Sequence, residues 1–592
     1  MTINRDYLVT ALFCLGFFLS LTAGMAGTRE LFIIVLCGLW LLPLLDLEKG
    51  NLFSSAEGGV SLFLLGLLPA LLFSPALHLS LLTFAKLLAA VGYLLAAHKM
   101  SQREGIPRQM VFGVVLLGVL VLCLFGVEQM LFPKEMPSHW VSQAQRNVLP
   151  FRVTSLFINP NPWGGFCAVA LAVILTVLVI TEEERVRWGA VFLAALLLMN
   201  LVASFSRGAW LSSLLAVFLT AFYGHWQKVR RPGLYHAIVL CLTVGIIAAC
   251  WLFPAVEARL ASMKKSGELG MNQRSLLYRG VLRHIKANLP FGSGLRTFQT
   301  LFPRYRLAGG QYVYEAHSDL LHILAEAGLT GFLGLLFMGA VFFRLNLAAP
   351  VDKGLPGLAL LIGFLLAANV VTFLHYTFLT IPLFATVGLT LQTREGDSAT
   401  IGFVGRATLS IVLALCTLYW GALYLSQGPF SQANSLFILS KKTRGQNKVI
   451  LLKEALKEVD KVLSTLPWRD DAHHLRGRIF KALGNNREAQ KSFQSALSHN
   501  ELEVTYRAAL AEVEWVKGEK KAAMQLFDEA LEGDPYSESL LLRKALLLQE
   551  MGQREAAINI LFKALQTNPQ FLIINRKAYE PIVRTLLEML KR

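Results

Sequence analysis

Charged side chains are scarce in this sequence. Asp, Glu, Lys and Arg together make up 16% of its 592 residues, whereas soluble proteins carry about 25%. The mean hydropathy is correspondingly high, at +0.51. The composition therefore excludes an ordinary soluble protein for the chain as a whole and indicates that much of it lies in lipid.

Cysteine and the common nucleotide-binding motifs are also rare or missing. The seven cysteines all lie in or at the edge of apolar runs, so nothing in their placement suggests a disulfide. No CxxC, Walker or dinucleotide-binding motif is present, which argues against an ATP-driven transporter. We expect no metal site, no cofactor and no nucleic-acid partner.

What the sequence does contain is a succession of apolar runs over its first ~430 residues. Each run is about 17–25 residues long, the length at which a helix crosses a bilayer. The first run has no convincing cleavage site behind it, so we expect it to be a retained anchor. The pattern predicts about 12–13 transmembrane helices within a domain at 1–428. The thirteen predicted spans are 6–25, 29–47, 58–75, 77–98, 109–131, 162–181, 187–205, 208–225, 234–254, 319–343, 355–373, 376–393 and 404–426.

The orientation of these spans follows from the basic residues of the short loops, because Lys and Arg favour the cytoplasmic side. With the N-terminus inside, the short outer turns near 27, 76 and 375 hold only Arg29. This arrangement puts two long segments outside, 132–161 and 255–318. It also puts the junction between the seventh and eighth spans outside.

Arg207 lies at that outer junction, in the stretch SFSRGAWLSS. An arginine at the bilayer centre costs at least about 2.5–3.5 kcal/mol, a cost that a position at the outer mouth of the bundle avoids. On this stretch alone, an interfacial arginine that reaches the headgroups is an equally good interpretation.

The two long outer loops are unusually rich in arginine for the outer side of a membrane. The first contains Arg146, Arg152 and the turn NPNP, and the second contains a predicted amphipathic helix at 272–288. The guanidinium group stays charged and pairs bidentately with phosphate oxygens. The loops therefore favour an outward-facing cavity for a lipid-borne phosphate. The basic residues of the second loop are Arg274, Arg279, Arg283, Lys286, Arg296, Arg304 and Arg306.

Some residues of the predicted loop helix also have a purely structural interpretation. Arg279 and Arg283 fit the solvated face of an amphipathic helix. Tyr278 shares a face with Arg274, because the two are four residues apart, and it fits a packing residue. Both interpretations remain open from the sequence.

Four stretches in order resemble the O-antigen ligase and O-antigen polymerase superfamily. They are RVTSLFINPNPWGGF at 152–166, the SRGAW turn at 206–210, PFGSGLRTF at 290–298 and AHSDLLHILAEAGLTGFLG at 316–334. Each stretch alone is weak, but the resemblance as a whole covers roughly residues 1–400, with the stretches in the expected order and on the expected side. One departure is Ser318, where family members often have Asn.

The resemblance implies an inverting, metal-independent glycosyltransferase whose donor is a glycan on undecaprenyl pyrophosphate. Arg207, Arg274 and Arg152 would bind the pyrophosphate, and His317 would act at the acceptor hydroxyl. Arginines can stabilise the charge that develops on a pyrophosphate leaving group, and histidine supplies a base near neutral pH. Secondary candidates for the site are Tyr278, Arg279 and Glu326.

His317 also has other interpretations. It could be a membrane-interface histidine that caps the next helix, and Glu315, Asp319 or Glu326 could supply the base instead. A metal site formed with His322 is not expected, because five residues correspond to about 140° around a helix.

The last part of the chain contains an internal repeat. Gly484, Gly518 and Gly552 are spaced 34 residues apart, and an alanine series and a leucine series share the same spacing. A 34-residue helix-turn-helix period is the tetratricopeptide signature, and it indicates about three repeats plus a leading half. The predicted fold class is thus all-α, with a transmembrane bundle followed by a tetratricopeptide solenoid at 429–592. Such arrays bind proteins or peptides on a concave face.

Three classes of function remain open. The first is a ligase that moves a glycan to a lipid or protein acceptor. The second is an O-antigen or exopolysaccharide polymerase, or a protein O-oligosaccharyltransferase, of the same superfamily. The third is a non-enzyme, either a flippase for lipid-linked glycans or a scaffold. We expect an enzyme in the bacterial inner membrane with periplasmic repeats, because thirteen spans leave residues 430–592 outside.

Overall fold

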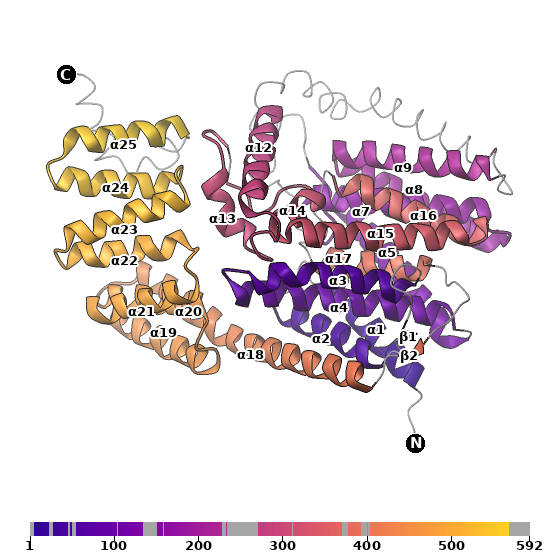
Figure 1. Cartoon of the computed structure of the whole chain (residues 1–592), viewed down its shortest axis with the longest axis horizontal. Helices are drawn as coiled ribbons and strands as arrows, with labels where there is room; N and C mark the ends of the chain where they lie inside the picture. Colours follow the sequence, from indigo (N-terminus) through magenta and orange to yellow (C-terminus); the bar gives the residue numbers. More distant parts are fainter. Residues whose placement is uncertain are drawn as a thin grey trace.

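The structure is a computed structural model in which a helical bundle adjoins a stack of paired helices (Figure 1). Helices account for nearly all of its regular structure, which confirms the all-α prediction. Among the described residues the exception is one antiparallel pair of two-residue strands, β1 (Glu48–Lys49) and β2 (Ala399–Thr400). The structure describes residues 5–22, 28–44, 48–49, 55–103, 105–133, 151–157, 159–227, 233, 270–310, 312–369, 374, 377–391, 399–400 and 403–567.

The bundle consists of long apolar helices that follow the predicted spans. Six described helices are long and apolar enough to cross a membrane, while the span predicted at 234–254 lies outside the described residues. Within the bundle α3 packs against α15, α4 against α17, and α7 against α8, α9 and α16. These helices are α1 (Arg5–Thr22), α2 (Thr28–Leu44), α3 (Ala56–Leu72), α4 (Leu77–Ser101), α5 (Ile106–Leu131), α7 (Pro160–Ile180), α8 (Glu184–Ala203), α9 (Arg207–Trp226), α15 (Gly328–Ala348), α16 (Val351–Ala367) and α17 (Thr377–Thr390).

The segment predicted as one span at 319–343 is instead two helices, α14 (Asp319–Glu326) and α15. The helix is interrupted at Gly328, whose φ of +65° is a conformation that favours glycine. A Cβ atom at Gly328 would lie 2.2 Å from the carbonyl oxygen of Pro290. The break thus accommodates the close approach of the 290–294 turn, a tertiary contact that apolar periodicity cannot reveal.

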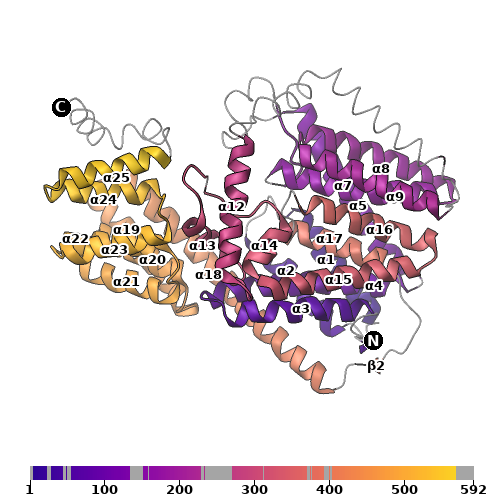
Figure 2. The ribbon, with the colours of Figure 1, turned by 45° about the horizontal axis from the view of Figure 1, so that its top comes forward.

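The second loop predicted to lie outside, which we call the outer segment after that prediction, folds against α14 in its described part. Its two helices are α12 (Gly270–Asn288) and α13 (Phe298–Tyr305). An apolar cluster joins the three helices, with Leu277 and Val281 from α12 packed with Phe298 and Ala325. Figure 2 shows α12, α13 and α14 between the bundle and the repeats. The arginine-bearing helix is therefore fixed against the segment that contains His317.

The repeats have the architecture that the 34-residue period predicts. Gly484, Gly518 and Gly552 all have φ between +79° and +92° at the turn within each pair, and Phe493 is fully buried. A Cβ atom at Gly477 would lie 2.5 Å from the Phe493 ring, so the small residue permits close helix packing. The helices are α19 (Gly445–Thr465), α20 (Asp470–Ala482), α21 (Asn486–His499), α22 (Val504–Val516), α23 (Lys520–Gly533), α24 (Glu538–Glu550) and α25 (Arg554–Thr567).

One long helix connects the two parts. Helix α18 (Phe403–Lys442) includes the last predicted span and continues without interruption into the repeats. Trp420 belongs to the core of the bundle, whereas Phe437 packs with α19 and α20. The predicted domain boundary at 428–429 therefore falls inside a continuous helix.

A buried ion pair fastens the repeats to the outer segment. The Arg306 guanidinium donates to Oδ1 of Asp534 from Nη2 at 2.9 Å and from Nε at 3.2 Å. Both side chains are less than a tenth exposed. Arg306 follows α13 and Asp534 follows α23, so this contact ties the repeat array to the loop beside the candidate site.

We expect Asp534→Ala to loosen this contact. Removing one partner of a buried pair costs about 3–5 kcal/mol, because the other charge stays buried without compensation. Amide hydrogen exchange in α13 and α23 should accelerate. The matched control is Glu532→Ala, at an exposed position two residues earlier. Equal exchange in the two variants would contradict a fastening role for the pair.

Candidate functional site

The turn that carries Arg207 is present as the sequence predicts. Helix α8 ends at Ala203, Phe205 has a φ of +49°, and Arg207 is the first residue of α9. The indole Nε1 of Trp210 donates to the carbonyl oxygen of Leu201 at 2.9 Å and braces the turn. The half-buried Arg207 side chain thus lies at a helix N-terminus, where free amides and the helix dipole favour an anion.

Arg152 lies behind this turn and is buried. Its Nε donates to the carbonyl oxygen of Ser204 at 2.9 Å, and its Nη2 donates to the carbonyl oxygen of Phe205 at 3.3 Å. The same Nη2 donates to Oδ1 of Asn161, in the NPNP stretch, at 2.9 Å. These bonds give Arg152 a part in positioning the turn that presents Arg207. Direct contact between Arg152 and a phosphate stays a prediction.

Arg274 reaches the same region from the outer segment. It lies exposed on α12, close enough to Arg207 for the two positive charges to repel each other. Neither side chain forms an ion pair with a carboxylate in the described part of the chain. Two neighbouring guanidinium groups without an acidic partner favour an anion between them.

His317 lies immediately before α14 in a left-handed backbone conformation, with a φ of +52°. Such a conformation is uncommon for a residue other than glycine, and functional sites are enriched in such strain. Its imidazole is 37% exposed, and its Nδ1 is 3.4 Å from Oε1 of the buried Glu315. The N-cap of α14 is Ser318, whose Oγ accepts from the amide of Leu321. The helix-cap explanation therefore applies to Ser318 rather than to His317.

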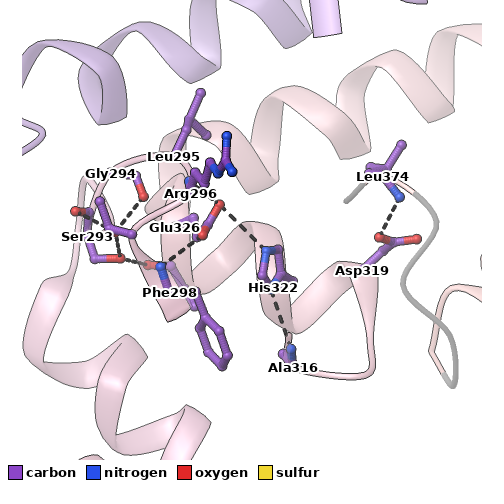
Figure 3. Close-up of polar contacts among 12 residues, drawn as sticks. Ser293, Gly294, Leu295, Arg296, Phe298, Ala316, Asp319, His322, Glu326 and Leu374 are labelled. Atoms are coloured by element: carbon purple, nitrogen blue, oxygen red, sulfur yellow. Dashed lines mark hydrogen bonds and ion pairs between the residues drawn. The ribbon is translucent and has the colours of Figure 1, made fainter. Parts of the chain in front are cut away.

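Glu326 holds the 290–298 loop in place (Figure 3). Its carboxylate accepts from the amide of Arg296 at 2.7 Å and from the amide of Phe298 at 2.9 Å, and it lies 3.6 Å from Nε2 of His322. Asp319 likewise accepts from the amide of Leu374 at 3.0 Å. Because these two carboxylates are bonded to the backbone, Glu315 is the carboxylate best placed to act together with His317.

Two buried histidines support this loop, and the sequence analysis did not assign them this role. Nε2 of His284 lies 3.0 Å from Oγ of Ser293, and His322 accepts from the amide of Ala316. Burial, with a smaller contribution from the charge of His322, lowers the pKa of His284 to about 4. Burial also lowers the pKa of His322 to about 4, although the negative charge of Glu315 acts to raise it. His284 could have been recognised from its helical spacing to Leu277 and Val281.

These pKa values predict that the outer segment loosens in acid. The unfolded chain, with histidine pKa values of about 6.5, binds more protons than the folded chain between pH ~6.5 and ~4. Stability is therefore complete above this window and falls as the pH is lowered through it. Hydrogen exchange in α12–α14, corrected for the intrinsic rate, should show less protection at pH ~4.5 than at pH ~7.5. His284→Gln should reduce this difference, and equal protection of the wild type at both pH values would contradict the explanation.

The remaining candidates lie on α12. Tyr278 is half-buried and packs against the apolar cluster, in agreement with the packing interpretation. Arg279 and Arg283 are exposed. Within the described ranges, no group of three or more His, Cys, Asp or Glu side chains is placed to hold a metal ion.

Comparison with known families agrees with the sequence resemblance. Residues 192–336 match the O-antigen ligase family, a stretch that includes Arg207, Arg274 and His317. Residues 474–538 and 538–571 match tetratricopeptide repeat families. The chain thus contains an O-antigen ligase domain followed by tetratricopeptide repeats. A search of curated proteins returns no match.

Two crystal structures of MamA align with parts of this chain. The first covers 29% of this chain and 97% of its own, at 16% identity and a TM-score of 0.21. The second covers 28% and 87%, at 17% identity and a TM-score of 0.20. These scores are too low to support a comparison of folds.

Proposed function

Because this membrane protein carries an O-antigen ligase domain followed by tetratricopeptide repeats, we propose that it is a glycosyltransferase of the ligase type. Its donor is a glycan on undecaprenyl pyrophosphate, and its acceptor is a hydroxyl group at the periplasmic face of the bacterial inner membrane. The reaction inverts the anomeric carbon and needs no metal. The observation that carries this proposal is the pair Arg207 and Arg274, two adjacent cations without a carboxylate partner among the described residues.

In this mechanism the two arginines hold the donor pyrophosphate. As the bond between the anomeric carbon and the phosphate oxygen breaks, negative charge grows on the leaving group. Guanidinium groups already aimed at that oxygen stabilise the transition state without reorganisation. The buried Arg152 fixes the turn on which Arg207 stands, so the cation is held in place before the donor arrives.

His317 acts as the base at the acceptor. With Nδ1 directed at Glu315, Nε2 is left to accept the proton of the acceptor hydroxyl as its oxygen bonds to the anomeric carbon. A carboxylate that orients a histidine in this way favours one tautomer and stabilises the imidazolium that forms. Direct attack from the face opposite the pyrophosphate inverts the configuration.

The test of this function uses the purified protein and an undecaprenyl-pyrophosphate oligosaccharide. Three acceptors are offered in parallel: a glycolipid, a second lipid-linked oligosaccharide and a hydroxyl-bearing peptide. Release of undecaprenyl pyrophosphate together with glycosylation of the glycolipid would support the ligase. Extension of the second lipid-linked oligosaccharide would indicate a polymerase, and modification of the peptide would indicate a protein oligosaccharyltransferase. Movement of the intact donor across a vesicle without transfer would indicate a flippase.

The periplasmic position of the repeats is a separate expectation. It is supported by the contact between Arg306, beside the proposed active site, and Asp534 of the repeats, because this contact requires both on one side. A reporter that is active only outside the cytoplasm should work when fused after Arg592. The same reporter should be silent when fused at Asp397. The opposite pair of results would place the repeats in the cytoplasm.

A further inference from the structure

A cavity lies where the bundle meets the repeats. We call it the junction cavity and define it by Lys86 of α4, Arg296, Tyr419 and Trp420 of α18, and Trp468 and Asp470 at the start of α20. Its volume is about 380 Å³, within the range of about 300–1,000 Å³ that is typical of small-molecule sites. The junction cavity therefore has walls from both domains and enough space for a ligand.

Two basic side chains belong to the wall of this cavity. Lys86 and Arg296 both line it, and they repel each other electrostatically. Neither forms an ion pair with a carboxylate anywhere in the described residues. Nζ of Lys86 lies 5.9 Å from the centre of the Trp420 ring. Asp470 and Asp471 also line the cavity and attract Arg296. Asp471 is already paired with Arg469, and Asp470 already accepts hydrogen bonds from Asn500 and Tyr506. The two basic side chains therefore favour a further anion.

The position of Arg296 is imposed by the backbone. Its φ is +62°, and its amide donates to Glu326 at 2.7 Å (Figure 3). Its side chain remains open to solvent inside the cavity. A strained residue that is fixed through its amide, and whose guanidinium group forms no ion pair within the described residues, is placed to meet a ligand.

The walls of the cavity suit a sugar. Tyr419 and Trp468 line the cavity with aromatic rings of the kind that pack against the C–H groups of a pyranose. Asp470 also belongs to the lining, but its carboxylate already accepts hydrogen bonds from Asn500 and Tyr506. The side chain of Trp420 is 5% exposed, and its Nε1 has no hydrogen-bond partner among the described residues. A buried indole N–H normally has a partner, so the wall of the cavity contains a hydrogen-bond donor whose partner is missing among the described residues.

A smaller recess adjoins the cavity. This recess, of about 130 Å³, shares Lys86 and Arg296 with it and is lined by His322 and Glu326 of α14. Helix α14 begins two residues after His317. The donor arginines Arg207 and Arg274 line neither the cavity nor the recess. His317 does not line them either, so a ligand here lies against α14, the helix that His317 precedes, and away from the donor arginines.

We infer that the junction cavity is the acceptor subsite and binds a saccharide with an anionic group, held between Lys86 and Arg296, while the repeats form one wall. The inference rests on the proposed function, because it takes transfer to an acceptor as given. A phosphate and a carboxylate share the required chemistry. The repeat domain then has a direct part in substrate binding, in addition to any protein partner on its concave face.

The first test is binding without any donor. The full-length protein in nanodiscs is titrated with a trisaccharide that carries a phosphomonoester, with one that carries a carboxylate at the same position, and with the neutral trisaccharide. The neutral probe should bind least, and the tighter of the two charged probes identifies the anion. Hydrogen bonds to charged groups contribute about 1.5–3 kcal/mol. Lys86→Gln or Arg296→Gln should therefore weaken the binding of that probe by tenfold or more. Inorganic phosphate should compete if phosphate is the preferred group.

Variants in the repeat domain test the shared wall. Trp468 is 45% exposed, so Trp468→Ala should leave the fold intact and still weaken the binding of the probe severalfold. Trp515→Ala, elsewhere in the repeats, and Arg344→Gln, exposed on α15 away from the cavity, are the matched controls. If the controls weaken binding as much as the cavity variants, or if the neutral probe binds equally well, the inference is wrong.

Steady-state kinetics separate this inference from the proposed function. The cavity variants should raise KM for the acceptor by tenfold or more and leave KM for the donor within about twofold. A rise confined to the donor KM would assign the cavity to the donor and overturn the inference. Cavity-dependent binding without any transfer by the wild type would reject the ligase, and with it the acceptor role of the cavity. Normal transfer without cavity-dependent binding would reject only the assignment of the cavity as the acceptor subsite.

Discussion

Replacing Arg207 or Arg274 by alanine is expected to lower glycan transfer by on the order of 10²–10³-fold or more, the usual effect of removing one group that stabilises transition-state charge. Neither residue forms an ion pair with a carboxylate in the described structure. Each variant should therefore still insert and fold. The loss should appear in both donor affinity and rate, because the pyrophosphate is bound in the ground state and gains charge as it leaves.

Lysine substitutions refine this expectation. Lysine keeps the charge but loses the planar fork that pairs with two phosphate oxygens. Arg207→Lys and Arg274→Lys should therefore recover only part of the activity. The matched control is Arg283→Ala, exposed on the same helix as Arg274, which should retain near-wild-type transfer.

The assay is run with purified protein, a lipid-pyrophosphate donor and excess EDTA. Retained transfer in either alanine variant would remove that arginine from the phosphate site. Inhibition of the wild type by EDTA would contradict the metal-independent mechanism, in which arginines do the work that a divalent cation does in other glycosyltransferases.

His317→Ala is expected to slow the chemical step by about 10²–10⁴-fold, the usual contribution of a general base. Donor affinity should change little, in contrast to the arginine variants. Wild-type activity should fall on the acidic side as the imidazole becomes protonated. In His317→Ala this acidic limb should disappear or move to the range of a carboxylate.

The comparison of pH–rate profiles for kcat and kcat/KM decides the role of His317. Near-wild-type turnover with an unchanged acidic limb would make it structural. Glu315 would then be the first alternative to test, because it lies 3.4 Å from the imidazole. Asp319 and Glu326 would come later, because each already accepts hydrogen bonds from the backbone.

The sequence allowed prediction of the features that depend on local pattern. Apolar run length gave the bundle helices, and the 34-residue spacing of Gly484, Gly518 and Gly552 gave the repeats. The turn before Arg207 was also predictable, since basic loops on alternate sides imply a junction at that point. Each of these signals lies within a few tens of residues of the structure it specifies.

Contacts between distant segments could not be predicted in this way. The Arg306–Asp534 pair spans 228 residues, and the break at Gly328 depends on Pro290 passing close by. Arg152 was expected to meet the donor, whereas its hydrogen bonds to Ser204 and Phe205 arise only once the turn is folded.

The most direct measurement of the central claim is the stereochemistry of a single turnover. The purified protein, in excess EDTA, is given an undecaprenyl-pyrophosphate glycan of defined anomeric configuration and an acceptor, and the new linkage is assigned by NMR. Our account predicts one undecaprenyl pyrophosphate released per glycan transferred, with inversion at the anomeric carbon. Retention of configuration, or a requirement for a divalent cation, would contradict it.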